Sequence, residues 1–296
     1  MKNEVNRAFM AKKKVLVLVA AMMAVVLSAK AEVEFAYDAG AELVSAYIWR
    51  GQYNGGLSFQ PDIELGFNAA DEAVEFRAGV WANLGASDWK FAKNQLPYFD
   101  EDLNPIDPNT RFMPEVDFMA RVSFFGASVG YNAYYYCNDG SDHTQELWFG
   151  YNFSHFFGDK AGAYINWYTT IAGGGDLKLE TDPVKILAGQ LERQAFSTYI
   201  ELGYDYTFDF GTTIGAQIGI SPWESPLYGN EKFAVTNLSL KVTQEWEFEH
   251  LTLDLFALGS LNPDGLDKEN VYINGSGDEK LYNQKLNGCI GLGIWF

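Results

Sequence analysis

Strict alternation of apolar and polar residues is the feature that most constrains the fold of this chain. From Leu57 to Phe67 every odd-numbered residue is apolar, and every even-numbered residue is polar or glycine. The same period of two recurs from Val74 to Leu84 and over residues 115–124. A period of two predicts a β-strand with one apolar face and one polar face.

Counted along the whole chain, this pattern predicts about twelve strands. They are expected near residues 40–50, 57–67, 74–84, 115–124, 127–137, 145–153, 161–171, 196–206, 212–221, 234–246, 250–260 and 285–296. The connections at one end are short, at 68–73, 125–126, 154–160, 207–211 and 247–249. Those at the other end include the long segments 85–114, 172–195, 222–233 and 261–284.

An even number of strands with short turns at one end and long loops at the other is typical of bacterial outer-membrane barrels. The alternative is a soluble β-sandwich, whose strands would bury one face in a core. Closing the sheet removes unpaired edges, which lipid does not tolerate. We therefore predict an all-β fold: a transmembrane antiparallel up-and-down β-barrel of about twelve strands, with short periplasmic turns and long extracellular loops.

The N-terminal segment has the three parts of a secretory signal peptide. Residues 1–14 are basic, residues 15–27 are almost entirely apolar, and Ala29-Lys30-Ala31 matches an A-x-A cleavage site. A buried core helix is the alternative, and the preceding charges disfavour it. We predict a cleaved signal peptide at 1–31, a barrel domain at 32–296, and a location in the cell outer membrane after export.

Composition excludes several other classes. The chain has 39 acidic and 21 basic residues, for a formal net charge of −18. Phosphate binding needs clustered Lys and Arg, so we expect no nucleic-acid partner. With 48% hydrophobic residues the chain has apolar surface to bury, which argues against disorder, and two cysteines cannot form a disulfide scaffold.

The last strand closes with an aromatic residue, because the alternation from Ile290 through Leu292 and Ile294 ends at Phe296. A terminal Phe in this setting resembles the C-terminal signal that assembly machinery reads in outer-membrane proteins. The expected partners are therefore outer-membrane lipid, the barrel assembly machinery through Phe296, and small-molecule solutes.

Three short segments of the N-terminal third resemble one family. These are Ser45-Ala46-Tyr47-Ile48-Trp49-Arg50-Gly51, Phe59-Gln60-Pro61 and Gly79-Val80-Trp81-Ala82-Asn83. They are similar to the opening of the TorF-like porins, outer-membrane barrels catalogued as conserved hypothetical proteins. The resemblance covers about residues 45–85. It implies a porin-like barrel with a largely unassigned substrate and carries over no catalytic residues.

The polar strand faces supply the candidate pore-lining residues. The charged set is Asp62, Glu64, Glu75, Arg77, Glu115, Asp117 and Arg121. The polar faces of other strands also carry Glu146, Glu201, Lys241 and Asp254. The aromatic set is Trp81, Tyr134, Tyr136, Trp148, Tyr164 and Tyr168, with Tyr199 on the same face. The charges predict either a compensating network that holds the wall or a selective constriction. The rings either line a path for solutes or fill and close the lumen.

Two pairings are expected from the short turns. Placing Phe67 opposite Val74 sets Arg77 against Glu64, and placing Phe124 opposite Ala127 sets Asp117 against Tyr134. Cys137 and Cys289 fall on opposite faces of distant strands, so we expect no disulfide between them.

The sequence offers little support for an enzyme. No zinc-ligand spacing or phosphate loop occurs. His143 with Ser141 is the one external Ser–His combination, and nothing nearby would orient the base. Asp100, Asp102, Asn104 and Asp107 place oxygen ligands at alternate positions but lack the glycine of a calcium loop. We predict no enzyme activity, no cofactor and no metal.

These observations predict an outer-membrane barrel that passes small solutes by passive diffusion and favours cations. Two alternatives stay open. One is a closed structural or surface-binding barrel that acts through its extracellular loops, and the other is a lipid-active outer-membrane enzyme.

Overall fold

The computed structural model describes residues 33–69, 74–85, 98–99, 105–106, 115–136, 143–158, 160–264, 271–273, 279–281 and 286–296. The predicted signal peptide at 1–31 lies outside the described residues. Within these ranges no helix is long and apolar enough to cross a bilayer.

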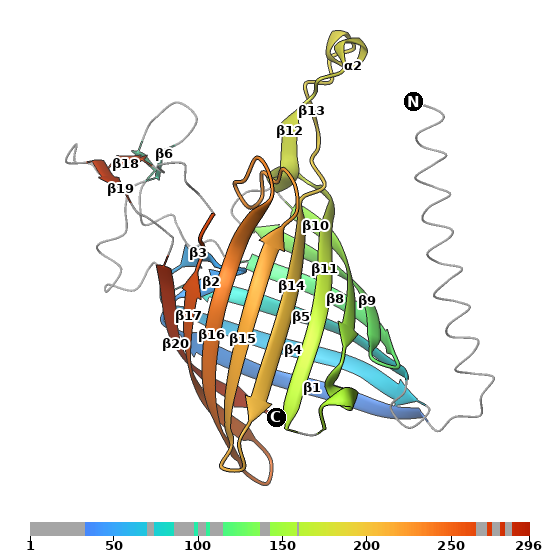
Figure 1. The fold of residues 1–296 in the computed structure, drawn as a ribbon, viewed down its shortest axis with the longest axis vertical. Helices are drawn as coiled ribbons and strands as arrows, with labels where there is room; N and C mark the ends of the chain where they lie inside the picture. Colours follow the sequence, from blue (N-terminus) through green and yellow to red (C-terminus); the bar gives the residue numbers. More distant parts are fainter. Residues whose placement is uncertain are drawn as a thin grey trace.

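In the described part of the chain, twelve strands form one closed antiparallel barrel (Figure 1). Each strand pairs with its neighbours in the sequence, and the last pairs with the first from Gly40 opposite Trp295 to Val44 opposite Gly291. The strands are β1 (Val33–Val44), β4 (Ser58–Ala69), β5 (Val74–Gly85), β8 (Glu115–Phe124), β9 (Ala127–Tyr136), β10 (His143–Asn152), β11 (Ala161–Gly173), β14 (Thr198–Thr207), β15 (Thr212–Ser221), β16 (Ala234–Glu247), β17 (Thr252–Leu261) and β20 (Leu286–Trp295).

The predicted barrel and its strand number are confirmed. One strand was misplaced, because the first wall strand is β1 at Val33–Val44 and not residues 40–50. Small residues such as Ala36 and Gly40 occupy the inward positions of β1 and weaken its alternation. Residues 45–57 leave the wall and belong to a separate hairpin.

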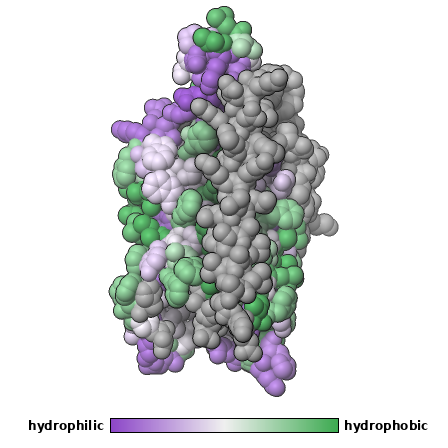
Figure 2. Space-filling model, turned by 90° about the vertical axis from the view of Figure 1, so that its right-hand side faces the viewer, coloured by the Kyte–Doolittle hydropathy of each residue, from purple (hydrophilic) through white to green (hydrophobic). Residues whose placement is uncertain are grey.

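The outward face of the barrel is apolar. Phe35 in β1, Leu240 in β16 and Ile290 in β20 are among many large hydrophobic side chains that are more than half exposed. Figure 2 shows hydrophobic residues over the barrel wall and hydrophilic residues at both ends. Exposed apolar surface on this scale needs a lipid environment, so the fold is that of a transmembrane β-barrel.

A charge on the outward face is therefore expected to destabilise the barrel. Leu240 lies near the middle of β16 and is 54% exposed. The variant Leu240→Arg should lower the free energy of unfolding from vesicles by about 2–4 kcal/mol, the cost of arginine near the bilayer midplane. Ser239→Arg is the matched control, because Ser239 bonds Gln217 on the inward face. Equal losses for the two variants, measured by denaturant titration of tryptophan fluorescence, would contradict the assignment of faces.

The short turns set the register. Phe125 and Gly126 have φ values of +48° and +82°, as in a type I′ turn, and they pair Phe124 with Ala127. The predicted match of Asp117 with Tyr134 is thereby confirmed. The predicted match of Arg77 with Glu64 is wrong. The β4–β5 ladder runs on to Ala69 opposite Val74, which places Arg77 opposite Gly66.

The other connections carry short elements of their own. Between β11 and β14, an excursion projects beyond the end of the barrel (Figure 1). It consists of η4 (Gly174–Asp176), β12 (Leu177–Leu179), α2 (Pro183–Leu187) and β13 (Glu192–Gln194). The remaining short elements are β2 (Tyr47–Trp49), β3 (Gln52–Gly55), β6 (Tyr98–Phe99), β7 (Pro105–Ile106), η3 (Ser154–Phe156), β18 (Val271–Ile273) and β19 (Glu279–Leu281).

Candidate functional site

The connection between β1 and β4 forms a hairpin, residues 45–57, that we call the lumen hairpin. Its two strands, β2 and β3, pair through Trp49 and Gln52. The tip residues Arg50 and Gly51 both have positive φ, +50° and +83°, which is the geometry of a type I′ turn. Glycine adopts this geometry without strain, and the turn places the Arg50 side chain at the tip of the hairpin.

The lumen hairpin crosses the interior of the barrel, as its contacts with distant wall strands show. A Cβ atom added at Gly51 would meet the Thr236 carbonyl of β16, so the backbone lies close against that strand. Its other wall contacts include those of Tyr47 with Trp81 of β5, Trp49 with Tyr134 of β9, Arg50 with Glu146 of β10, Tyr168 of β11 and Tyr199 of β14, and the Gly51 carbonyl with Asn287 of β20. Contacts on so many sides are possible only from within the lumen.

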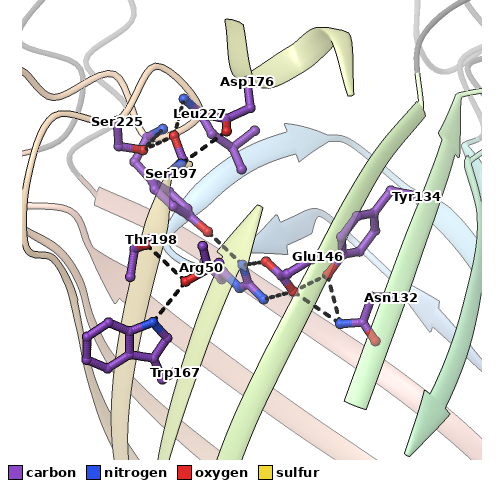
Figure 3. Close-up of polar contacts among 12 residues, drawn as sticks. Arg50, Asn132, Tyr134, Glu146, Trp167, Asp176, Ser197, Thr198, Ser225 and Leu227 are labelled. Carbon is purple, nitrogen blue, oxygen red and sulfur yellow. Dashed lines mark hydrogen bonds and ion pairs between the residues drawn. The ribbon is translucent and has the colours of Figure 1, made fainter. Parts of the chain in front are cut away.

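Arg50 is held by a bidentate ion pair. Its Nη1 donates to Oε2 of Glu146 at 2.6 Å, and its Nη2 donates to Oε1 at 2.8 Å. Nη1 also donates to the Tyr228 hydroxyl at 2.6 Å. The side chains of Arg50 and Glu146 are only 8% and 1% exposed. Figure 3 shows the guanidinium and carboxylate meeting in the lumen.

Aromatic rings enclose the same guanidinium. Its central carbon lies 3.9 Å from the ring centroid of Tyr168, 4.5 Å from that of Trp49 and 5.0 Å from that of Tyr199. Trp49 in turn stacks on Tyr228, with centroids 5.9 Å apart. We call the residues around Arg50 the guanidinium cage: Trp49, Tyr134, Glu146, Tyr168, Tyr199 and Tyr228. Cation–π contacts of this kind strengthen when water is excluded.

The cage side chains have partners of their own. Glu146 Oε1 also accepts hydrogen bonds from the Tyr134 hydroxyl at 2.9 Å and from Asn132 at 3.1 Å. The Tyr199 hydroxyl accepts a bond from Asn237 at 3.2 Å. Burial is the largest single influence on the pKa of Arg50 and acts to lower it, but electrostatic interactions with Glu146, Tyr228 and Tyr134 and the hydrogen bond to Glu146 together raise that pKa well above its ordinary value. The arginine therefore stays charged.

The Tyr228 side of the cage comes from the connection between β15 and β16. Gln52 of the lumen hairpin donates to the Leu227 carbonyl at 3.1 Å. Ser225 donates to Ser197 at 2.7 Å, and the backbone amide of Ser197 donates to Asp176 at 3.1 Å (Figure 3). Three connections at this end of the barrel are thus joined by hydrogen bonds.

Most of the predicted charged residues lie in a second cluster on β4, β5 and β8. Arg121 contacts Glu64 at 3.0 Å and Glu75 at 3.1 Å. Arg77 lies 3.4 Å from Glu75 and donates to two backbone carbonyls, those of Phe67 and Phe76. A 40 Å³ cavity in this cluster is lined by Glu64, Arg77, Met119, Ala120, Arg121, Asn132 and Trp148. Their role in a pore stays a prediction.

Three inward carboxylates are not fully satisfied. One oxygen each of Asp62, Asp117 and Asp254 is buried without a hydrogen-bond partner among the described residues. Glu115 is also buried and lies two residues from Asp117 on the same face of β8. Asp62, Asp117 and Asp254 lie on β4, β8 and β17, so the incompletely paired carboxylates are spread around the wall.

Three of the predicted aromatic residues, Trp148, Tyr168 and Tyr199, form a connected row. Ring centroids are 6.0 Å apart between Trp148 and Tyr168 and 6.1 Å apart between Tyr168 and Tyr199. Glycines on adjacent strands make room for these rings, because a Cβ at Gly130 would overlap Trp148 and one at Gly219 would overlap Tyr199. Tyr164 packs in the same way on a neighbouring glycine. The side chain of Tyr136 lies outside the described part of the structure.

Sequence reasoning missed the centre of the site. Arg50 and Trp49 were read as part of a strand and a family motif, and Tyr228 was not singled out. The available signal was the loss of strict alternation over residues 45–56, where three glycines interrupt the pattern. Glu146 on the inward parity was a second signal, since a buried carboxylate needs a donor.

The other predicted features lie apart from the cage. His143 stacks on Tyr135, with centroids 5.6 Å apart, and Ser141 lies outside the described residues. Cys289 is buried beside Val44 and Phe256, while Cys137 and the acidic segment at 100–107 contribute no described side chain. No group of three or more potential metal ligands occurs among the described residues.

The pairing of the strands and the outward apolar face define the class of this protein, a transmembrane β-barrel. No protein-family model matches the chain, and no curated protein matches it. The resemblance to the TorF-like porins therefore stays a prediction.

Several solved outer-membrane proteins are similar to this chain. The COG4313 outer membrane channel from Pseudomonas putida F1 is 10% identical, with 90% of this chain and 94% of that chain covered and a TM-score of 0.43. The KdgM porin is 7% identical, with 88% and 97% covered and a TM-score of 0.39. Outer membrane phospholipase A from Escherichia coli is 9% identical, with 90% and 98% covered and a TM-score of 0.41. Likeness at this level carries no functional information.

Proposed function

We propose that this protein is an outer-membrane channel that passes small solutes by passive diffusion and prefers cations. The observation that carries the proposal is the acidic inner wall with its incompletely paired carboxylates. The predicted signal peptide, the outer-membrane location and recognition of Phe296 by assembly machinery are part of the same proposal.

The inner wall has a strong excess of negative charge. Strand alternation places three bases inward, Arg77, Arg121 and Lys241, and the lumen hairpin adds Arg50. The inward acids include Asp38, Glu42, Asp62, Glu64, Glu75, Glu115, Asp117, Glu146, Glu201, Asp205 and Asp254. Low-dielectric walls strengthen the field of such charges and concentrate cations between them.

A purely structural role explains only part of this wall. Glu64, Glu75 and Glu146 have arginine partners, as a charge-compensating network requires. Asp62, Asp117 and Asp254 each keep an oxygen without a partner among the described residues. Leaving such a group in a dry interior costs several kcal/mol. A hydrated lumen with mobile cations removes that cost, which supports a channel.

One observation favours the surface-binding alternative. The projecting excursion carries exposed apolar side chains at its tip, including Val184 and Leu187, the latter 88% exposed. A barrel that works through its loops would use such a tip. The lipid-active enzyme has no comparable support, because His143 stacks on a tyrosine.

The reversal potential across a planar bilayer with a KCl gradient tests the proposal. We expect cation-selective current from the refolded protein. The triple variant Asp62→Asn, Asp117→Asn, Asp254→Asn should lower the cation-to-anion permeability ratio several-fold, because it removes three wall charges. The control is Asp182→Asn, Glu192→Gln, in the projecting excursion outside the barrel. Anion selectivity, or equal ratios for wild type and triple variant, would contradict the proposal.

A further inference from the structure

The guanidinium cage combines hydrogen bonds and ring contacts to its occupant. The carboxylate of Glu146 meets two different nitrogens of Arg50, and Tyr228 accepts a further bond from Nη1. The faces of the group are covered by Tyr168, Trp49 and Tyr199. A planar group that forks onto a carboxylate and is enclosed by aromatic rings is an arrangement that suits guanidinium and not a compact ammonium.

The wall supplies most of the cage without help from the lumen hairpin. Glu146, Tyr168 and Tyr199 come from β10, β11 and β14. Glu146 is held by Tyr134 and Asn132, and Tyr199 is held by Asn237. These bonds do not involve Arg50, so the wall side of the site is preorganised and Arg50 behaves as an internal ligand.

The lumen hairpin is a separate two-stranded sheet, so moving it out of the cage would break no strand ladder of the barrel. Its two ends are adjacent on the wall, because Val44 and Ser58 are register partners of β1 and β4. Its contacts with the wall are side-chain contacts and single backbone bonds, such as the one from the Ser45 amide to the Ile290 carbonyl, and not a strand ladder. If the guanidinium of a solute replaced that of Arg50 in the cage, it would form the same hydrogen bonds, and the net charge within the cage would not change.

We infer that the guanidinium cage is a binding site for small solutes that carry a guanidinium group, which compete with Arg50 as they enter the channel. The role of this site in permeation rests on the proposed function, whereas binding of the guanidinium group does not. An internal ligand on a short tether has an effective concentration in the millimolar range or above. Solutes therefore compete with Arg50 at millimolar concentrations, which suits a channel with low affinity.

The test removes the internal ligand. Arg50→Ala empties the cage, and methylguanidinium chloride is the probe, with methylammonium chloride and urea as charge-only and shape-only comparisons. In planar bilayers we expect methylguanidinium to block the Arg50→Ala current in brief, saturable events at concentrations about tenfold below those needed for wild type. The double variant Arg50→Ala, Glu146→Gln should need at least about tenfold more probe, because the charged bidentate partner is gone.

Calorimetric titration of folded protein in detergent separates the two proposals, with folding checked by heat-modifiable mobility. Methylguanidinium binding to Arg50→Ala without any channel current would contradict the proposed channel function and support the binding site. Channel current without methylguanidinium binding would contradict the binding site and support the channel. Equal binding of methylammonium and methylguanidinium, or equal binding by the single and double variants, would also overturn the proposed binding site. Arg50 would then only hold the lumen hairpin in place.

Discussion

The variant Glu146→Gln is expected to release the lumen hairpin and speed tryptic cleavage after Arg50 about 100-fold. In the native protein Arg50 is 8% exposed and paired with Glu146 on two nitrogens. Removing one partner of a buried ion pair costs about 3–5 kcal/mol. Gln retains one hydrogen-bond acceptor, so we expect the closed hairpin to lose stability near the lower limit, roughly 3 kcal/mol. Each 1.4 kcal/mol raises the population of open hairpin about tenfold.

The cleavage rate reports that population when the hairpin opens and closes faster than trypsin cuts. Protein in vesicles would be digested over time, and the fragment that ends at Arg50 would be quantified by mass spectrometry. Glu75→Gln is the matched control, because Glu75 contacts Arg121 and Arg77 in the other cluster. Equal cleavage rates for Glu146→Gln and wild type would show that the ion pair does not hold the hairpin.

The barrel could be predicted from the sequence because its determinants are local. Alternation in β4 and β5 follows directly from one face in lipid and one in the lumen. The Phe125-Gly126 turn fixed one register correctly. The β4–β5 register failed because polar residues next to a turn pair as strand here, with Asn68 opposite Glu75.

The guanidinium cage could not be predicted in the same way. Arg50 lies 96 residues from Glu146 and 178 residues from Tyr228 along the chain. Nothing in the local pattern of residues 45–57 shows whether that hairpin turns outward to solvent or inward to the lumen. The inward orientation is decided by the wall, where a buried Glu146 between tyrosines requires a positive partner.

The lumen hairpin is also expected to set the conductance of the channel. Because Val44 and Ser58 are already paired, an Asn-Gly turn can replace residues 45–57 and close β1 to β4 directly. That replacement removes Trp49 and Arg50 from the lumen and leaves the wall strands unchanged. The same operation on the projecting excursion gives a matched control, since Leu179 and Glu192 are partners and Asn-Gly can replace residues 180–191.

Single-channel conductance of these two variants and the wild type, recorded in the same salt, tests the account most directly. We predict a several-fold larger conductance when the lumen hairpin is replaced and an unchanged conductance when the projecting excursion is shortened. The same conductance in all three proteins would contradict the claim that residues 45–57 narrow an ion-conducting lumen.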